Sequence, residues 1–539
     1  MKDRWPLIQR GLFPETLPPC FTSVDLKRAF SGLIRDLKAR ELRSGRQTDY
    51  VRYSGTKHDG NRRYYGTPNP ISYFYVASFI SKHWPEFEAR FINSPFSVSQ
   101  PKLGKPTDDR PIVVQSLSEL TTIASKKLGR SAFLLKTDVA QFFPSIYTHA
   151  ISWSAHGIDQ AKADRAPGST VNYFNRLDFF THSCQLGETR GVLVGPDAFR
   201  LIAEYIAAGL DADFFANQAN FVIGAARHVD DYYIGVRGEP EALAALSVLR
   251  DILQRYSLHI NDAKTRVMPA IEPLNDVWAQ ALRKEAREIT APFWGSNAND
   301  TILFYDRALT TGKEVHSDSP VKIALRAFDQ LKIYDSQLWD TMEPYLQRTM
   351  FHHPHCIDYV ALIVAKRVAR GGAIDTTGWK EAAYDLIQRH LPLNHHQEVV
   401  WLLWLLLVAG LEITDQLVTS LSNNDNAHIR SLVVAAFTDG RIARRPPIRL
   451  GSKLATTDQH WLLNLVAKAR GYSGAAFSGG LSAEFQHLAT KRVRLIDFKA
   501  HMKTMRKDNV KAISRSRYGY DSDDYDNGPD DFDVDEFDL

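Results

Sequence analysis

The pattern of apolar and polar positions changes near the middle of the chain. In the N-terminal half, short apolar runs with the length and the Val, Ile, Phe and Tyr content of strands occur at 111–114, 132–135, 221–223 and 232–236. Between them, residues 197–210 and 240–256 carry apolar positions at helical spacing. Strands and helices interspersed in this way predict an α+β domain over about residues 1–290.

From about residue 317 onward the strand signals stop. Helical segments follow at intervals of roughly 20 residues, at 321–331, 336–349, 357–369, 379–390, 398–409, 427–437 and 459–469. This spacing predicts an all-α helical-repeat domain over 300–490, an α-solenoid of the HEAT-like kind, with a compact helical bundle as the alternative. The longest apolar run, 399–411, is too short to cross a bilayer and predicts a buried helix.

Composition places the chain among ordinary globular proteins, with 44% hydrophobic and 24% charged residues. The three cysteines are widely spaced and form neither a CxxC zinc pattern nor a disulfide framework. The N-terminus lacks the apolar core of a signal peptide. We therefore expect a soluble, cytoplasmic protein with no membrane association.

Charge is distributed unevenly along the chain. Ten acidic residues lie between 521 and 539, so removing them from the net charge of +4 leaves +14 for the rest. Such a basic body favours a polyanionic partner such as nucleic acid, although excess lysine and arginine also serve solubility alone. A basic segment at 491–517 precedes the acidic tail at 518–539, which we predict to be disordered.

The strongest chemical signal is a pair of adjacent aspartates. Asp230 and Asp231 lie between apolar segments that would form a β-hairpin, where two carboxylates held close together are suited to Mg²⁺. A solvated turn is the alternative. Asp138 ends another apolar strand, and a third carboxylate on a neighbouring strand matches what two metal ions require in phosphoryl transfer.

These residues belong to a set of six motifs, in order over about residues 50–270, that resembles reverse transcriptases. Within that family, the closest resemblance is to the bacterial abortive-infection and defence-associated "unknown group" enzymes. Residues 138–147 resemble motif A and 228–231 motif C. Motif B is matched by 191–196 with Arg200 and Glu204, motif D by 258–265, and the fingers motifs by 62–70 and 101–111.

The resemblance implies a fingers-palm domain followed by the helical repeats, and a DNA polymerase that uses two Mg²⁺ ions, with Mn²⁺ as a substitute. Asp138 and Asp230 would be the principal metal ligands, with Asp231 a less certain third. Phe143 matches the steric gate that selects dNTPs, and either it or Phe142 must be a core aromatic.

Three cations are further candidates for nucleotide binding. Lys105 and Arg110 would clamp the triphosphate, and Lys264 would act as a general acid. The alternative for each is an exposed surface cation.

Two departures from the family pattern lie near the expected primer and template. His228 stands where motif C has tyrosine, and Arg190 precedes Gly191 where many reverse transcriptases have glutamine. Both argue against ordinary templated copying. Members of the resembled group make DNA without an added template or on a noncoding RNA, and some prime from a tyrosine.

That resemblance makes three tail tyrosines, Tyr518, Tyr520 and Tyr525, candidates for priming. The expected partners are dNTPs, the DNA product and a noncoding RNA, together with a second copy of the chain or a second defence protein.

Two rival interpretations remain. The first is a catalytically silent palm on a helical scaffold that binds RNA or a partner protein, and the second is a mobile-element reverse transcriptase of the retron or group II intron kind. No nuclease constellation is visible, and the histidines after residue 351 are predicted to cap helices or face solvent, namely His352, His353, His355, His395 and His396.

Overall fold

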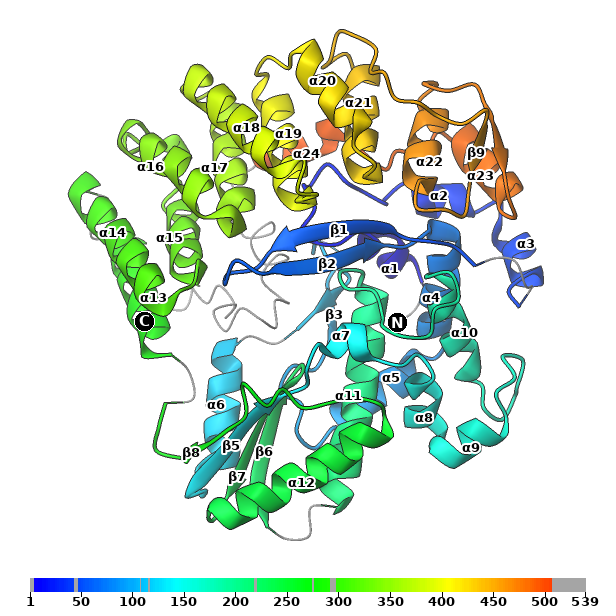
Figure 1. The fold of residues 1–539 in the computed structure, drawn as a ribbon, viewed down its shortest axis with the longest axis vertical. Coiled ribbons are helices and arrows are strands. Elements are labelled where there is room, and N and C mark those ends of the chain that lie inside the picture. Colours follow the sequence, from blue (N-terminus) through cyan, green and yellow to red (C-terminus); the bar gives the residue numbers. More distant parts are fainter. Residues whose placement is uncertain are drawn as a thin grey trace.

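The computed structural model describes residues 4–42, 47–106, 108–114, 117–217, 221–273, 276–290 and 297–506. It is a mixed α and β structure whose C-terminal region is helical (Figure 1). The acidic tail with Tyr518, Tyr520 and Tyr525 lies outside the described residues. None of the described helices is both long and apolar enough to cross a bilayer.

An antiparallel four-stranded sheet lies at the bottom of the view in Figure 1. Its strands are β5 (Phe133–Asp138), β6 (Val222–His228), β7 (Asp231–Val236) and β8 (Arg266–Pro269), in the spatial order β6-β7-β5-β8. Side chains alternate between the two faces of a sheet. Leu134 and Tyr233 therefore pack with α6 (Leu117–Leu128), whereas Leu135 and Ile234 join the main core with α11 (Asp197–Asn217) and α12 (Glu239–Arg255). Because both faces are covered, all six residues of β7 are buried.

Shorter elements surround this sheet. The helices are α1 (Trp5–Arg10), α2 (Leu26–Phe30), α3 (Ile34–Ala39), α4 (Pro70–Lys82), α5 (Trp84–Ile92), α7 (Phe142–Ser145), α8 (Ala150–His156), α9 (Ile158–Ala163) and α10 (Asn175–Ser183), and the strand pair is β3 (Lys102–Leu103) with β4 (Ile112–Val113). Helix α4 begins where Asn69 caps the backbone N–H of Ile71 and Pro70 takes the first helical position.

The C-terminal helices form an arc above the sheet (Figure 1). They are α13 (Val277–Thr290), α14 (Ala298–Val315), α15 (Ser319–Gln330), α16 (Trp339–His352), α17 (Ile357–Ala369), α18 (Thr376–His390), α19 (His396–Ala409), α20 (Asp415–Asn423), α21 (Ala427–Thr438), α22 (Trp461–Ala469), α23 (Ser482–Thr490) and α24 (Phe498–Arg506), with the 3₁₀ turns η1 (Ile333–Asp335) and η2 (Pro354–Cys356). Most pack on a helix one or two places away in the chain, which favours a stacked array over a compact bundle. Helix α19 is buried along almost its whole length, as its unbroken apolar run predicts.

One expectation for this half is wrong. Strands β9 (Lys453–Ala455) and β10 (Ala476–Ser478) pair in parallel within the helical region. Each has only three residues, too few for an alternating pattern to stand out in the sequence.

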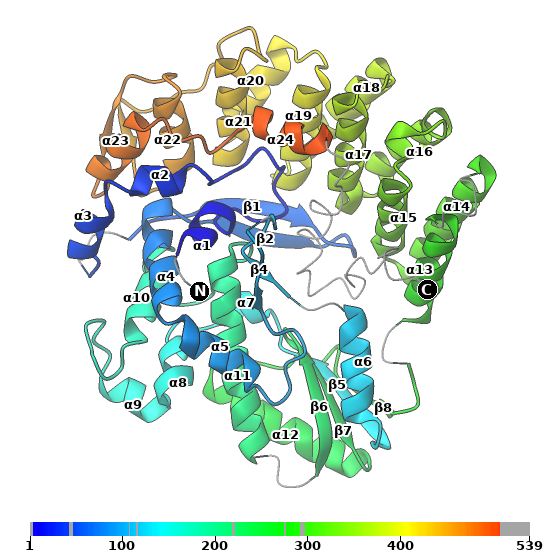
Figure 2. The ribbon, with the colours of Figure 1, turned by 180° about the vertical axis from the view of Figure 1, so that it is seen from behind.

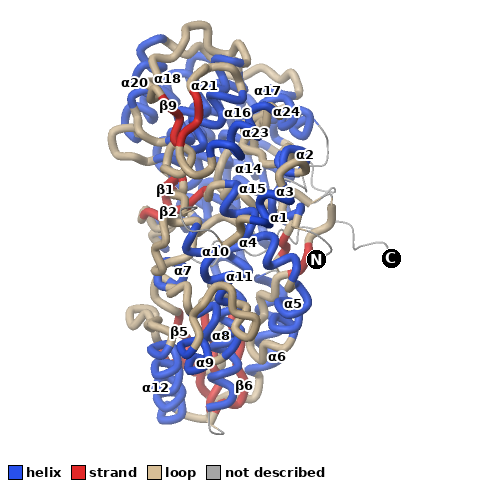
Figure 3. The backbone as a smooth tube through the Cα atoms, turned by 90° about the vertical axis from the view of Figure 1, so that its right-hand side faces the viewer, coloured by secondary structure: helices blue, strands red, loops and turns tan. Residues whose placement is uncertain are grey.

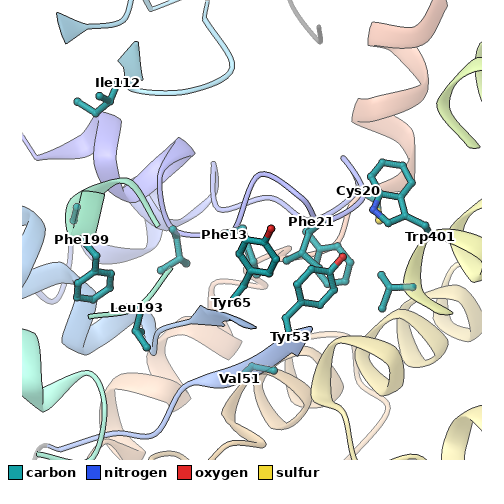
Figure 4. Close-up of a cluster of buried hydrophobic side chains, with 14 of the residues drawn as sticks. Phe13, Cys20, Phe21, Val51, Tyr53, Tyr65, Ile112, Leu193, Phe199 and Trp401 are labelled. Atoms are coloured by element: carbon teal, nitrogen blue, oxygen red, sulfur yellow. The ribbon is translucent and has the colours of Figure 1, made fainter. Parts of the chain in front are cut away.

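A β-hairpin joins the two halves of the molecule. Strands β1 (Val51–Thr56) and β2 (Arg62–Thr67) lie between the helical arc and the sheet, as the front, back and side views agree (Figures 1, 2 and 3). Tyr53 and Tyr65 of the hairpin share one hydrophobic cluster with Phe13 of the N-terminal segment and Trp401 of α19 (Figure 4). This continuous core holds the hairpin between the two halves.

Candidate active site

The three aspartates come together at one end of the sheet. Asp138 is the last residue of β5 and Asp231 the first residue of β7, and the two are direct partners in the antiparallel register. Asp230 lies in the two-residue turn between His228 and Asp231. Adjacent strands thus deliver carboxylates that are 92 and 93 residues apart in sequence.

The turn that carries Asp230 has an unusual backbone. Val229 has a φ of 54°, a conformation that a β-branched residue rarely adopts. Two contacts hold it there: its N–H donates to Ser99 Oγ at 2.9 Å, and its carbonyl accepts from Arg227 Nη1 at 2.6 Å. Strain that is stabilised by its surroundings is typical of functional sites.

Arg227 anchors this hairpin through a buried network. Its fully buried guanidinium forms ion pairs with Asp211 at 2.8 Å and with Glu204 at 2.8 Å. Burial alone would lower the pKa of Arg227, but the two carboxylates raise it well above its usual value. Tyr232 also donates to Asp211 at 3.0 Å. Glu204, which lies in the segment that resembles motif B, therefore helps to hold the aspartate turn in place through Arg227.

Asp138 is almost fully buried, with 6% of its surface exposed. Its Oδ2 lies 3.0 Å from Lys264 Nζ and 3.5 Å from Asn261 Nδ2, and within the described part of the chain its buried Oδ1 has no hydrogen-bond partner. The loop carrying Lys264 is held in place because the Asn261 N–H donates to the Asp138 carbonyl at 2.9 Å. The segment that resembles motif D thus lies directly beside the segment that resembles motif A.

A cleft of about 630 Å³ opens over these side chains. Asp138, Asp230 and Lys264 line one side of it, and the β1–β2 hairpin lines another with Lys57, His58, Asp59, Arg62, Arg63, Tyr64 and Tyr65. Asp231 is buried beside Asp138 and is not among the described lining residues. Of the three aspartates, Asp138 and Asp230 are therefore the two that face the cleft.

Phe142 and Phe143 both border the cleft from α7, with their rings 5.8 Å apart. Phe142 is buried, with 3% of its surface exposed, whereas Phe143 is only partly buried. Gly191 packs against this turn with a φ of 85°, and a Cβ there would lie 3.2 Å from the Pro144 carbonyl oxygen. Gly191 thus permits the close approach of its loop to α7.

Lys105 and Arg110, the two cations expected to clamp a triphosphate, are not among the residues that line the cleft. Arg110 is buried, forms an ion pair with Asp197 at 3.0 Å and donates to the carbonyls of Phe13 and Gly195. Lys105 is exposed in the β3–β4 loop. No sequence pattern indicated a role for the hairpin cations Lys57, Arg62 and Arg63, although Arg62 and Arg63 begin the segment that resembles a fingers motif.

His228 and Arg190 lie outside the cleft lining. His228 ends β6 opposite Asp231 and is half-buried. Burial and the neighbouring Arg227 lower its pKa to about 4, so its imidazole is neutral at neutral pH. Arg190 is exposed, and its backbone forms an isolated β-bridge with Tyr147.

A separate histidine cluster lies in the helical half. It consists of His390, His395 and Glu398, whose possible metal-ligating atoms all lie within 4.8 Å of one another. Among the described residues no other group of three meets this spacing, so the ligand atoms of Asp138, Asp230 and Asp231 are spaced more widely. Both oxygens of Glu398 already accept hydrogen bonds from Arg62, whose charge would repel a metal ion there. This cluster is therefore structural.

The expectation that the late histidines cap helices or face solvent is wrong for His355. It is buried with 3% exposure, and its Nδ1 lies 2.7 Å from the Thr56 carbonyl oxygen of the hairpin. Sequence spacing could not show this contact, because its partner lies 299 positions away.

Comparisons with known proteins give only a distant likeness. No protein-family model matches the chain, and no curated protein sequence matches it. Apo telomerase from Candida tropicalis aligns with a TM-score of 0.32 and 12% identity, over 71% of this chain and 73% of the telomerase chain. Telomerase from Candida albicans in complex with a fragment of telomeric RNA aligns with a TM-score of 0.30 and 10% identity, over 69% and 68%. Similarity at this level assigns no function to the chain.

Proposed function

We propose that this protein is a reverse-transcriptase-like nucleotidyltransferase, a Mg²⁺-dependent DNA polymerase that adds dNTPs to a primer 3′-hydroxyl. The observation that carries the proposal is the position of Asp138 and Asp230 at one end of the sheet, facing the same cleft. Aromatic and cationic side chains also line this cleft, as a nucleoside triphosphate requires.

The aspartates fit divalent metal ions. Mg²⁺ prefers hard oxygen ligands, and the buried Asp138 Oδ1 lacks a hydrogen-bond donor among the described residues. Bound at Asp138 and Asp230, two ions would activate the primer hydroxyl and stabilise the charge that develops in phosphoryl transfer.

The chain's own residues take the remaining roles. Lys264, whose Nζ lies 3.0 Å from Asp138 Oδ2, would protonate the departing pyrophosphate. Phe143 contributes its partly buried ring to the cleft wall and selects against a ribose 2′-hydroxyl. The hairpin cations Arg62 and Arg63 attract the triphosphate from the other side.

The biological setting rests on the sequence resemblance. It supports antiphage defence by abortive infection, with untemplated or noncoding-RNA-templated synthesis. Priming by Tyr518, Tyr520 or Tyr525 stays a prediction, which is tested by changing all three to phenylalanine and measuring DNA covalently attached to the protein. Undiminished attachment would exclude the tail tyrosines as primers.

Labelled dNTPs test the activity directly. We expect the purified chain to form acid-insoluble product with Mg²⁺, alone or with its co-purifying RNA, and Asp138→Asn and Asp230→Asn to abolish it. Asp251→Asn, on the exposed face of α12, is the matched control and retains activity. If no product forms with or without RNA, the catalytically silent scaffold becomes the better interpretation. Sequencing the bound nucleic acid then identifies template, product and primer together.

A further inference from the structure

A second pocket lies among α8, α9 and α10, apart from the catalytic cleft. Its volume is about 220 Å³, and none of its described lining residues also lines the cleft. They are Tyr147, His149, Ser152, Trp153, Ala161, Lys162, Arg165, Asn175 and Asp178.

Aromatic rings form the wall of this pocket. Tyr147 and Trp153 have ring centroids 5.5 Å apart at 62°, and His149 lies 4.5 Å from Tyr147. All three side chains are only partly buried, so part of each ring remains accessible. Accessible aromatic rings provide stacking surfaces for unpaired bases.

Among the described residues that line the pocket, Asp178 has an unsatisfied carboxylate oxygen. Asp178 is 8% exposed, and its Oδ2 accepts from His149 Nδ1, while its buried Oδ1 has no hydrogen-bond partner within the described residues. Asn175 is already bonded to Ser152 and to the Asp164 carbonyl. Because an unsatisfied buried carboxylate oxygen is costly, a ligand that brings an N–H group to Asp178 is favoured.

Cations border the pocket. Lys162 and Arg165 are both exposed, and Lys162 Nζ lies 5.5 Å from the Trp153 ring. An aromatic wall, a carboxylate acceptor and two exposed cations together complement a base, its amino group and its phosphate.

The pocket is close to the catalytic cleft. Pro144 lines the cleft and Tyr147 lines the pocket, so at most about 11 Å of chain separates them. A strand that leaves the cleft can therefore reach the pocket within a few nucleotides.

We propose that this pocket binds an unpaired nucleotide of the nucleic-acid strand held in the cleft. The base lies against Tyr147 and Trp153 and donates a hydrogen bond to Asp178 Oδ1, while Lys162 and Arg165 contact the phosphate. This inference rests on the proposed function, since it assumes that the strand is the substrate, the product or the template of the polymerase.

Binding of fluorescently labelled single-stranded 12-mers to the full chain tests the proposal. In Lys162→Gln/Arg165→Gln we expect affinity to fall and the slope of log K against log salt to decrease by about two. Trp153→Leu should weaken binding roughly five- to 100-fold, consistent with the loss of one stacked base. The matched control is Lys284→Gln/Arg287→Gln, two exposed cations on α13 across the molecule (Figure 1), which should bind as wild type does.

Separate measurements with DNA 12-mers and with RNA 12-mers show which kind of strand the pocket binds. A 5-bromouracil-substituted strand should photo-crosslink within residues 147–165. Equal affinity of both pocket variants and wild type, or crosslinks confined to other segments, would overturn the inference. Because binding needs no chemistry, Asp138→Asn should form no product and still bind through the pocket. If the wild-type chain also forms no product but binds the 12-mers in a pocket-dependent way, this inference stands and the polymerase proposal fails.

Discussion

Arg62 of β2 and Glu398 of α19 form an ion pair that joins the cleft to the helical half of the molecule. Glu398 is fully buried, and both of its oxygens accept hydrogen bonds from the Arg62 guanidinium, which also donates to Ser54 and Thr56. The two residues are 336 positions apart in the sequence. Arg62 also lines the cleft. The helical region therefore holds one wall of the cleft in position through Glu398.

Glu398→Gln should therefore destabilise the protein and weaken dNTP binding. Removing the carboxylate leaves a largely buried guanidinium without its counter-charge, at a cost of roughly 3 kcal/mol. Calorimetry should show a lower unfolding temperature, and steady-state kinetics a higher KM for dNTPs. Glu412→Gln, which removes an exposed partner of Lys380, should change neither quantity. A variant with unchanged KM would show that the hairpin holds its position without the ion pair.

Phe143→Ala should relax sugar selection. The ring is only partly buried beside the cleft, so its removal opens space for a 2′-hydroxyl, and the preference for dNTPs over NTPs should fall by roughly tenfold or more. Competition between labelled dATP and ATP measures this ratio. Phe142→Ala, which removes a buried ring, should instead cost about 3–5 kcal/mol of stability. Equal selectivity in Phe143→Ala and wild type would remove the steric-gate role.

Lys264→Gln should separate metal binding from catalysis. The ammonium lies 3.0 Å from Asp138 Oδ2 and competes with a cation for that carboxylate, so the variant should bind Mg²⁺ more tightly by isothermal titration. Loss of the general acid should at the same time lower kcat about 100-fold. Weaker Mg²⁺ binding in Lys264→Gln would show that the lysine orients Asp138 and does not compete with the metal.

Acid should loosen the contact between the hairpin and the helices. Burial lowers the pKa of His428 to about 3 and that of His390 to about 4, both below the ordinary value of 6.5. The folded state therefore disfavours protonation of these two histidines. The contribution of these neutral histidines to the free energy of unfolding is fully present above about pH 6.5. It falls as the pH drops toward the folded pKa values, by at most about 1.4 kcal/mol per pH unit for each histidine.

His428→Gln removes one of these titrating groups, while an amide can still bond to Thr67, the present partner of His428 Nε2 at 2.9 Å. Its unfolding temperature should decline less steeply than that of wild type between pH 6.5 and 5. Parallel profiles for the two proteins would mean that His428 does not contribute to the acid sensitivity.

Short-range patterns predicted much of the architecture. The strands that carry Asp138 and Asp231, and the buried helix α19, follow from local apolar runs, because burial on both faces or all around requires an unbroken hydrophobic segment. The resemblance predicted that Lys264 lies near the incoming triphosphate, which stays a prediction; in the structure its Nζ lies 3.0 Å from Asp138 Oδ2.

The sequence by itself thus determined which segments become most of the strands and helices, and it supplied the candidate catalytic side chains. Only the tertiary structure decided that Arg110 binds Asp197 inside the protein, that Arg62 takes a place in the cleft wall, and that Glu398 holds it there. The reason is physical: strand and helix periodicity is encoded within a few residues. The partner of a buried charge is set by which distant surfaces meet when the hairpin packs between the sheet and the helical arc.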